Sequence, residues 1–292
     1  MQDILAVIDK IISGLSNPNG KTALPGFGFI SCGSRVTIRH VPFYDPCIIL
    51  VLSGRKRIGK MACAAGSAIT VPAPASYDLR NEPDPHSGRY RALIIPFEHE
   101  DLDRLRSVHE IKPTRRPTPI GPLQYDCDAT LSDAIKHYLS SHGNAQLRKH
   151  RLLEILLILT TKDQRLLAYP LARENWAQRV RACLAADLAH AWSIGEVCKH
   201  LATSESSLRR NLQGENTGFR ELLQDLRLSS ALMQLLQTSL PVYRIAYDCG
   251  YQSVSRFTSN FHKRFGLSPS ALRREADENE QNLAVREHSP AA

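Results

Sequence analysis

Two stretches near the C-terminus decide the fold: SIGEVCKHLATSESSLRRNL at residues 193–212 and VYRIAYDCGYQSVSRFTSNFHKRF at residues 242–265. Each holds two short runs with helical apolar spacing, separated by a turn. A helix-turn-helix needs a small residue where its helices touch and a second one, ideally glycine, at the turn four positions later. Cys198 and Ala202 fill these positions in the first stretch, and Ala246 and Gly250 fill them in the second. The sequence therefore predicts two helix-turn-helix units.

The apolar positions of both units predict the faces that turn inward. They are Ile194, Val197, Leu201, Leu208 and Leu212 in the first unit and Ile245, Tyr251, Phe257 and Phe261 in the second. Ser204 is a natural N-cap for the second helix of the first unit. Between the units, ELLQDLRLSSALMQLLQ at residues 221–237 predicts one long helix that joins both into a rigid body.

Several motifs over about a hundred residues resemble the AraC/XylS family of bacterial transcription regulators. They are Arg227-Leu228 with Ala231, I-A-x-x-x-G-Y at 245–251, Ser255-Arg256-Phe257, Phe261, and F-G-L-S-P at 265–269. The second unit matches better than the first, where Asn211-Leu212 stands in place of the family's usual apolar residue and Phe. The resemblance implies that the second helix of each unit enters the major groove of promoter DNA.

The resemblance also implies which side chains face the DNA. They are Glu205, Ser206, Arg209, Arg210 and Gln213 in the first unit, and Ser253, Val254, Ser255, Arg256, Ser259, Asn260 and Lys263 in the second. Arginines such as Arg209 and Arg210 can bind guanine with two hydrogen bonds, and Asn260 could reach adenine. His262 and Lys263 suit phosphate better. We expect the first unit to be the more discriminating reader of sequence.

The charge of the chain is consistent with a polyanionic partner. Its 292 residues carry a formal net charge of +8, and residues 171–274 hold 14 Lys and Arg against 8 Asp and Glu. A basic balance raises the expectation of nucleic acid without establishing it. Residues 275–292 carry five acidic residues and one Arg, which predicts a disordered acidic tail.

The N-terminal half has a different texture, with one amphipathic helix at residues 3–15 and then many short β-branched runs from 27 to 97. Such runs predict an antiparallel sandwich or barrel. YDPCIILVLSGRKRIG at 44–59 and AAGSAITVP at 64–72 resemble the cupin-like sensor domain of the same family. The chain is thus expected to be an α+β multidomain protein, with a cupin-like effector-sensing and dimerisation domain at 1–165 and an all-α DNA-binding domain at 172–274.

A strongly apolar helix is predicted within residues 131–161. Its segment HRLLEILLILTT at 150–161 is too apolar to face water, so we expect it to pack against the barrel or in a dimer interface. The residues assigned to dimerisation are Leu152, Leu153, Leu156 and Leu159.

No catalytic or metal motif appears in the sequence. His40 lacks the H-x-H spacing of a metal-binding cupin, and seven cysteines form no C-x-x-C pair. Cys47, Cys198 and Cys249 are expected to be buried, which leaves Cys32, Cys63 and Cys127 as candidate redox sensors. No stretch reads as a signal peptide or a membrane span. We therefore expect a cytoplasmic protein that is not an enzyme and has no metal or cofactor.

Three functional hypotheses follow from these observations. The leading one is a homodimeric, sequence-specific transcription regulator, an activator that works with RNA polymerase and is controlled by a small-molecule effector or a partner at its N-terminal domain. In the second, that domain only dimerises or binds a protein. The third is a cupin enzyme fused to a DNA-binding domain. A closed apolar cavity would favour a ligand, whereas convergent His or carboxylate side chains would favour an enzyme.

Overall fold

The computed structural model of this protein describes residues 8, 11, 28–108, 121–168 and 175–277. The chain divides into two compact units. The first comprises residues 1–171 with 236–239 and 271–292, and the second comprises residues 172–235 with 240–270.

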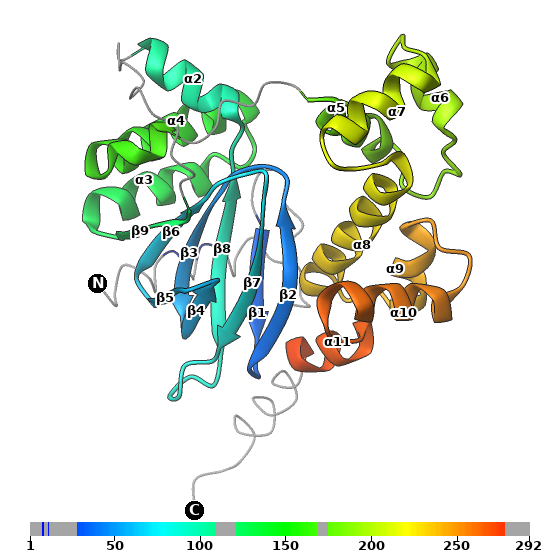
Figure 1. The fold of residues 1–292 in the computed structure, drawn as a ribbon. Helices are drawn as coiled ribbons and strands as arrows, with labels where there is room; N and C mark the ends of the chain where they lie inside the picture. The colour runs from blue at the N-terminus through cyan, green and yellow to red at the C-terminus, as the bar shows by residue number, and fades with distance from the viewer. Residues whose placement is uncertain (1–7, 9–10, 12–27, 109–120, 169–174, 278–292) are drawn as a thin grey trace, which may run out of the picture. The chain divides into compact units, whose positions relative to one another are not determined.

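The first unit is built on two antiparallel sheets (Figure 1). The five-stranded sheet has the order β1-β8-β3-β6-β9, with β1 at Gly28–Cys32, β8 at Tyr90–Pro96, β3 at Cys47–Ser53, β6 at Ser67–Val71 and β9 at Leu123–Asp126. The four-stranded sheet has the order β2-β7-β4-β5, with β2 at Val36–Phe43, β7 at Ala75–Glu82, β4 at Arg55–Ile58 and β5 at Met61–Ala64.

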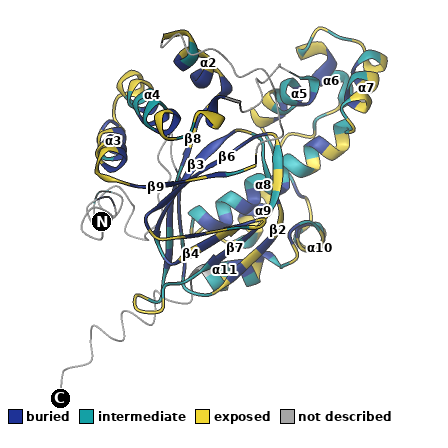
Figure 2. Cartoon of the chain, turned by 60° about the vertical axis from the view of Figure 1, so that its left-hand side comes forward, coloured by how far each residue is buried: buried dark blue, intermediate teal, exposed yellow. Residues whose placement is uncertain are grey.

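Both faces of the five-stranded sheet are covered. In β3, Ile48 and Leu50 belong to the core formed with the helices, whereas Ile49 and Val51 alternate to the opposite face and are equally buried. Six of the seven β3 residues are therefore buried. Figure 2 colours buried residues dark blue. This burial explains why the sequence CIILVLS is a continuous apolar run instead of an alternating one.

Helices cover the outer face of this sheet. They are α2 at His99–Val108, α3 at Ala129–Ser140 and α4 at Ala145–Lys162, followed by the 3-10 helix η1 at Gln164–Ala168. Side chains cap the N-termini of α3 and α4, because Asp128 accepts a hydrogen bond from the backbone N–H of Leu131 and Asn144 accepts one from that of Leu147. The core they enclose with the sheet is one continuous apolar cluster.

The structure corrects the predicted role of three leucines in α4. Leu152, Leu156 and Leu159 are buried in the core of their own domain, so their side chains already have apolar partners within one chain. They are not available to a second subunit. Leu153 stays partly exposed and can still take the interface role predicted for it.

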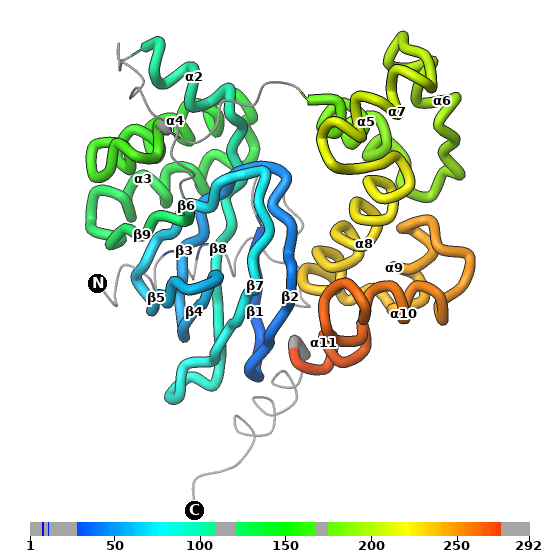
Figure 3. Tube along the Cα trace, viewed as in Figure 1, coloured from blue at the N-terminus to red at the C-terminus, as the bar shows by residue number. Residues whose placement is uncertain are grey.

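The second unit is helical, and Figure 3 traces its path. Its helices are α5 at Trp176–Ala185, α6 at Ile194–His200, α7 at Glu205–Gly214, α8 at Phe219–Gln237, α9 at Val242–Asp248 and α10 at Val254–Phe265. The chain continues into α11 at Pro269–Asp277, most of which belongs to the first compact unit. The long helix α8 lies between the α6–α7 pair and the α9–α10 pair along the chain, as predicted. The predicted helix at 3–15 and the predicted tail lie outside the described residues, apart from Ile8, Ile11 and the end of α11.

Candidate nucleic-acid interface

The first helix-turn-helix consists of α6 and α7, joined by a turn whose second residue has an unusual backbone. Ala202 adopts φ +50°, in the left-handed region that favours glycine. Ser204 then caps α7 by accepting a hydrogen bond from the backbone N–H of Ser207 at 3.2 Å. Val197, Cys198, Leu208 and Leu212 are buried, and they hold the two helices against α5. The small residues at 198 and 202 thus occupy the contact and the turn.

The second helix-turn-helix, α9 with α10, repeats this geometry. Gly250 adopts φ +78° in its turn, and Ser253 caps α10 by accepting a hydrogen bond from the backbone N–H of Arg256. The inner face of α10 is a row of aromatic rings in tilted or edge-to-face contact, with centroids 5.6 Å apart for Phe257 and Phe261 and 4.8 Å apart for Phe261 and Phe265. Burial of these rings fixes the opposite face of α10 toward solvent.

Arg227 of α8 contacts both helix-turn-helix units. Its guanidinium donates hydrogen bonds to the backbone oxygens of Leu188 at 2.9 Å and His190 at 2.8 Å, in the segment before α6. The same guanidinium lies against Gly250 in the turn of the second unit. A second tie joins α10 to α8, where Arg264 Nε lies 3.1 Å from Asp225 Oδ1. Arg227 is one of the residues that carry the AraC/XylS resemblance, but no pattern in the sequence indicates its backbone partners.

The residues predicted to face DNA in α7 lie on one solvent-exposed face. Glu205, Ser206, Arg209, Arg210 and Gln213 are all exposed. Arg209 lies 3.3 Å from the carboxylate of Glu205, one turn away. Arg210 makes no ion pair with any residue in the described part of the chain, so its guanidinium is available to a partner.

The outward face of α10 is also mostly exposed, including Ser255, Arg256, Ser259 and Lys263. Val254 and Asn260 are only partly exposed. Asn260 and Val254 therefore expose less of their side chains to a partner than the four exposed residues do. Burial raises the pKa of the Tyr251 hydroxyl, which lies in the turn before α10.

Comparison with known proteins fits this arrangement. A family model described as a helix-turn-helix domain matches residues 197–275, which contain both units apart from the start of α6. The C-terminal region of this chain is an AraC-type helix-turn-helix domain. Within the AraC-type domain, the predicted double helix-turn-helix is confirmed.

Curated relatives of this chain are transcription regulators. They include the DNA-binding dual transcriptional regulator Rns of Escherichia coli, 28% identical over 49% of this chain and 54% of Rns. The regulator GadX of Escherichia coli strain K12 is 30% identical over 42% of this chain and 46% of GadX. The chain thus spans about half the length of the curated relatives it matches, in alignments long enough to hold the AraC-type domain.

Solved structures extend the likeness to the whole fold. A ligand-free ToxT variant of Vibrio cholerae aligns with a TM-score of 0.62 at 16% identity, over 86% of this chain and 97% of ToxT. Wild-type ToxT bound to an unsaturated fatty acid aligns with a TM-score of 0.60 at 15% identity, over 87% and 97% of the two chains. This confirms the predicted fold class, a cupin-like antiparallel domain with an AraC-type domain.

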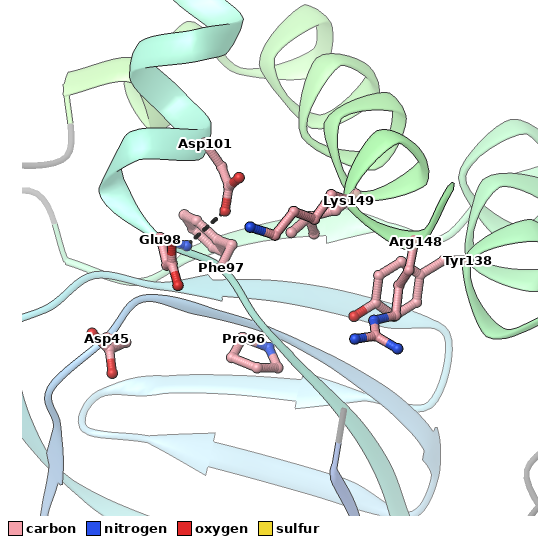
Figure 4. A pocket seen from close by; sticks show the side chains of 9 residues that line it. Asp45, Pro96, Phe97, Glu98, Asp101, Tyr138, Arg148 and Lys149 are labelled. Carbon is pink, nitrogen blue, oxygen red and sulfur yellow. Dashed lines mark hydrogen bonds between the residues drawn. The ribbon is translucent and has the colours of Figure 1, made fainter. Parts of the chain in front are cut away.

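A surface pocket of about 270 Å³ lies in the N-terminal domain, where β8 leads into α2 (Figure 4). Asp45, Glu98 and Asp101 line one side of it, and Arg148 and Lys149 of α4 line another. Asp101 also caps the start of α2, because its carboxylate accepts the backbone N–H of Glu98 at 2.8 Å. With both signs of charge facing solvent, the pocket does not select a ligand of one charge.

Other candidate groups are accounted for by their surroundings. His40 is exposed, and no group of three or more potential metal ligands occurs among the described residues. Burial raises the pKa of Cys32 to about 12 and that of Cys127 to about 11, which disfavours the reactive thiolate. No helix in the described ranges is long and apolar enough to cross a bilayer.

Proposed function

We propose that this chain is a sequence-specific transcription regulator that binds promoter DNA through α7 and α10. The observation that carries the proposal is the pairing of two helix-turn-helix units on one helix, each with an exposed polar and basic face. Arg210 would read guanine, and Lys263 would contact phosphate. Glu205, Ser206, Arg209, Gln213, Ser253, Val254, Ser255, Arg256, Ser259 and Asn260 remain the other proposed contacts.

We also propose that residues 1–165 form the effector-sensing and dimerisation domain and residues 172–274 the DNA-binding domain. The fatty acid bound to ToxT, in a structure of the same fold, supports a small-molecule effector here. The partly exposed Leu153 of α4 supports a homodimer through that helix. We propose further that the chain activates transcription together with RNA polymerase in the cytoplasm. The name of the transcriptional activator CfaD of Escherichia coli, 33% identical over 32% of this chain, supports the activation.

Selection from a randomised duplex library tests the DNA-binding proposal. The full chain should enrich one sequence with two elements about one helical turn apart, since two successive major grooves on one face are separated by that distance. On the enriched site, the logarithm of the binding constant should fall linearly with the logarithm of salt concentration, because Arg and Lys displace counterions from phosphates. Failure to enrich any sequence, or a flat salt response, would contradict the proposal.

A further inference from the structure

The interior of the N-terminal domain, between its two sheets, contains a buried lysine. In β4, burial alternates along the strand, so Arg55 and Arg57 face solvent while Lys56 and Ile58 face the space between the two sheets. The Lys56 side chain is only 2% exposed. Strand register places it opposite Asn81 on β7 and Cys63 on β5, both of which are also buried.

Lys56 makes fewer hydrogen bonds than its ammonium group can donate. Its ammonium can donate three hydrogen bonds, and its Nζ donates one to Asn81 Oδ1 at 2.9 Å. The Nζ also lies 5.5 Å from the centroid of the Tyr90 ring, which belongs to the facing sheet. No carboxylate in the described part of the chain forms an ion pair with Lys56.

Tyr90 adds a second unsatisfied donor at the same place. The residue is 0% exposed, and its hydroxyl has no hydrogen-bond partner among the described residues. A buried hydroxyl left unpaired costs about 1–3 kcal/mol, so native structures rarely retain one. The space between the sheets therefore holds a lysine ammonium with one hydrogen bond and, on the aromatic ring near it, a tyrosine hydroxyl with none.

Neighbouring groups do not balance the positive charge. Burial lowers the pKa of Lys56 to about 8, so the amine is still mostly protonated at neutral pH. Burial also raises the pKa of Cys32 and Cys47 to about 12, which keeps both thiols neutral. An ammonium in an apolar interior is costly unless an anion pairs with it.

We propose that Lys56, Asn81 and Tyr90 form a binding site for the carboxylate of a small organic acid inside the N-terminal domain. The carboxylate would pair with the Lys56 ammonium and accept a hydrogen bond from Tyr90. Val36, Ile38, Ile58 and Leu79 share the inner face with Lys56 by register and alternation, so the rest of the ligand would be apolar. This inference rests on the proposal that the N-terminal domain senses an effector, and it assigns the residues that do so.

The test uses the full chain and pairs of probes that differ only in charge. Carboxylates from acetate to hexadecanoate are compared with the primary alcohol of the same length, by thermal unfolding and calorimetry after overnight equilibration. We expect at least one carboxylate to raise the unfolding temperature more than its alcohol. Lys56→Met should weaken binding of that carboxylate at least tenfold, whereas Lys60→Met, at an exposed lysine in the turn after β4, should leave it unchanged.

Two further variants keep the test sharp if Lys56→Met folds poorly. Tyr90→Phe removes only the unpaired hydroxyl, so we expect the free protein to be as stable as the wild type and carboxylate binding to weaken about threefold to tenfold. Asn81→Asp supplies an internal carboxylate 2.9 Å from the amine if the side chain keeps its position. This variant should be more stable without ligand and should no longer respond to the carboxylate.

The inference is overturned if alcohols act as well as carboxylates, or if no carboxylate distinguishes the wild type from Lys56→Met. It is also overturned if Asn81→Asp responds like the wild type. Binding of the full chain to its selected DNA site, measured without any carboxylate, separates the two proposals. Loss of that binding contradicts the regulator itself, whereas retained DNA binding with no carboxylate response contradicts only the site at Lys56.

Discussion

The guanidinium of Arg227 fills the space beside Gly250 that a side chain would occupy. A Cβ at position 250 would lie 2.5 Å from Nη2 and 2.6 Å from Cζ of Arg227, and 2.4 Å from the backbone oxygen of Leu188 that Arg227 holds. Because Arg227 also holds the backbone of Leu188 and His190, one contact connects the turn of the second unit to the start of the first.

Gly250→Ala should therefore destabilise the AraC-type domain by more than about 1 kcal/mol, since the new methyl group collides with Arg227 and the left-handed backbone disfavours alanine. Urea denaturation followed by circular dichroism measures this. Gly214→Ala is the matched control, because that glycine lies in α7 with no atom near its missing Cβ. The control should be neutral or more stable, and equal losses in both variants would refute the explanation.

Ala202→Gly should have the opposite effect. Ala202 is held at φ +50°. Glycine avoids a steric cost of about 1–2 kcal/mol in this conformation. It also loses more backbone entropy on folding than alanine, which costs about 0.5–1 kcal/mol. We expect a net stabilisation of up to about 1 kcal/mol in urea denaturation. Ala182→Gly, at an exposed position within α5, should instead cost about 1 kcal/mol. A loss of stability in Ala202→Gly would show that the turn does not strain alanine.

Substitutions in α4 should separate the core from the interface. Leu156 is fully buried, so Leu156→Ala should destabilise the N-terminal domain by about 2–5 kcal/mol. Leu153→Arg should keep the fold and convert dimers to monomers. Sedimentation velocity and thermal unfolding measure the two effects. A folded Leu153→Arg variant that still sediments as a dimer would place the interface elsewhere.

Arg210→Ala should change the DNA sequence preference of the protein, whereas Lys263→Ala should change only its affinity for DNA. If Arg210 binds guanine with two hydrogen bonds, its loss should cost about 1–3 kcal/mol at the selected site and relax the preference at one base pair. If Lys263 contacts phosphate, its loss should weaken all sequences alike and reduce the salt slope by about one. Library selection with each variant measures both effects. An unchanged base preference in a folded Arg210→Ala variant would mean that another residue reads the sequence.

The capping box at the start of α6 should contribute to stability in acid. Hydrogen bonds from the Ser193 side chain and backbone, then from His190, lower the pKa of Glu196 from 4.5 to about 2. A lowered pKa stabilises the folded state above the unfolded pKa, and this contribution disappears as pH falls from about 4.5 to 2. Glu196→Gln should therefore lose less stability than the wild type over that window in urea denaturation. Parallel curves for the two proteins would refute the assignment.

The two helix-turn-helix units were predictable because their signals are local. The spacing of Leu208 and Leu212, or of Phe257 and Phe261, fixes one face of a helix, and the turn demands a small residue at 202 and 250. The bonds of Arg227 were not predictable, because its acceptors are backbone oxygens 37 and 39 residues away. No side-chain pattern in a sequence records such a contact.

In the N-terminal domain, contacts between the two sheets could not be predicted from the sequence. Alternation within RKRI could have placed Lys56 on the inner face, since only one side of an edge hairpin is buried. The unpaired hydroxyl of Tyr90 depends on how two sheets meet, which the sequence does not encode locally. For the same reason, the apolar segment of α4 left open whether its leucines bury in the domain or in a dimer.

The helix α8 that joins the two units has a consequence for the DNA as well. If one body presents both α7 and α10, the protein cannot stretch to follow a changed site. Inserting a single base pair between the two elements displaces one by about 3.4 Å and turns it by roughly 35° around the duplex. Promoters under this protein would therefore tolerate base substitutions more readily than insertions or deletions.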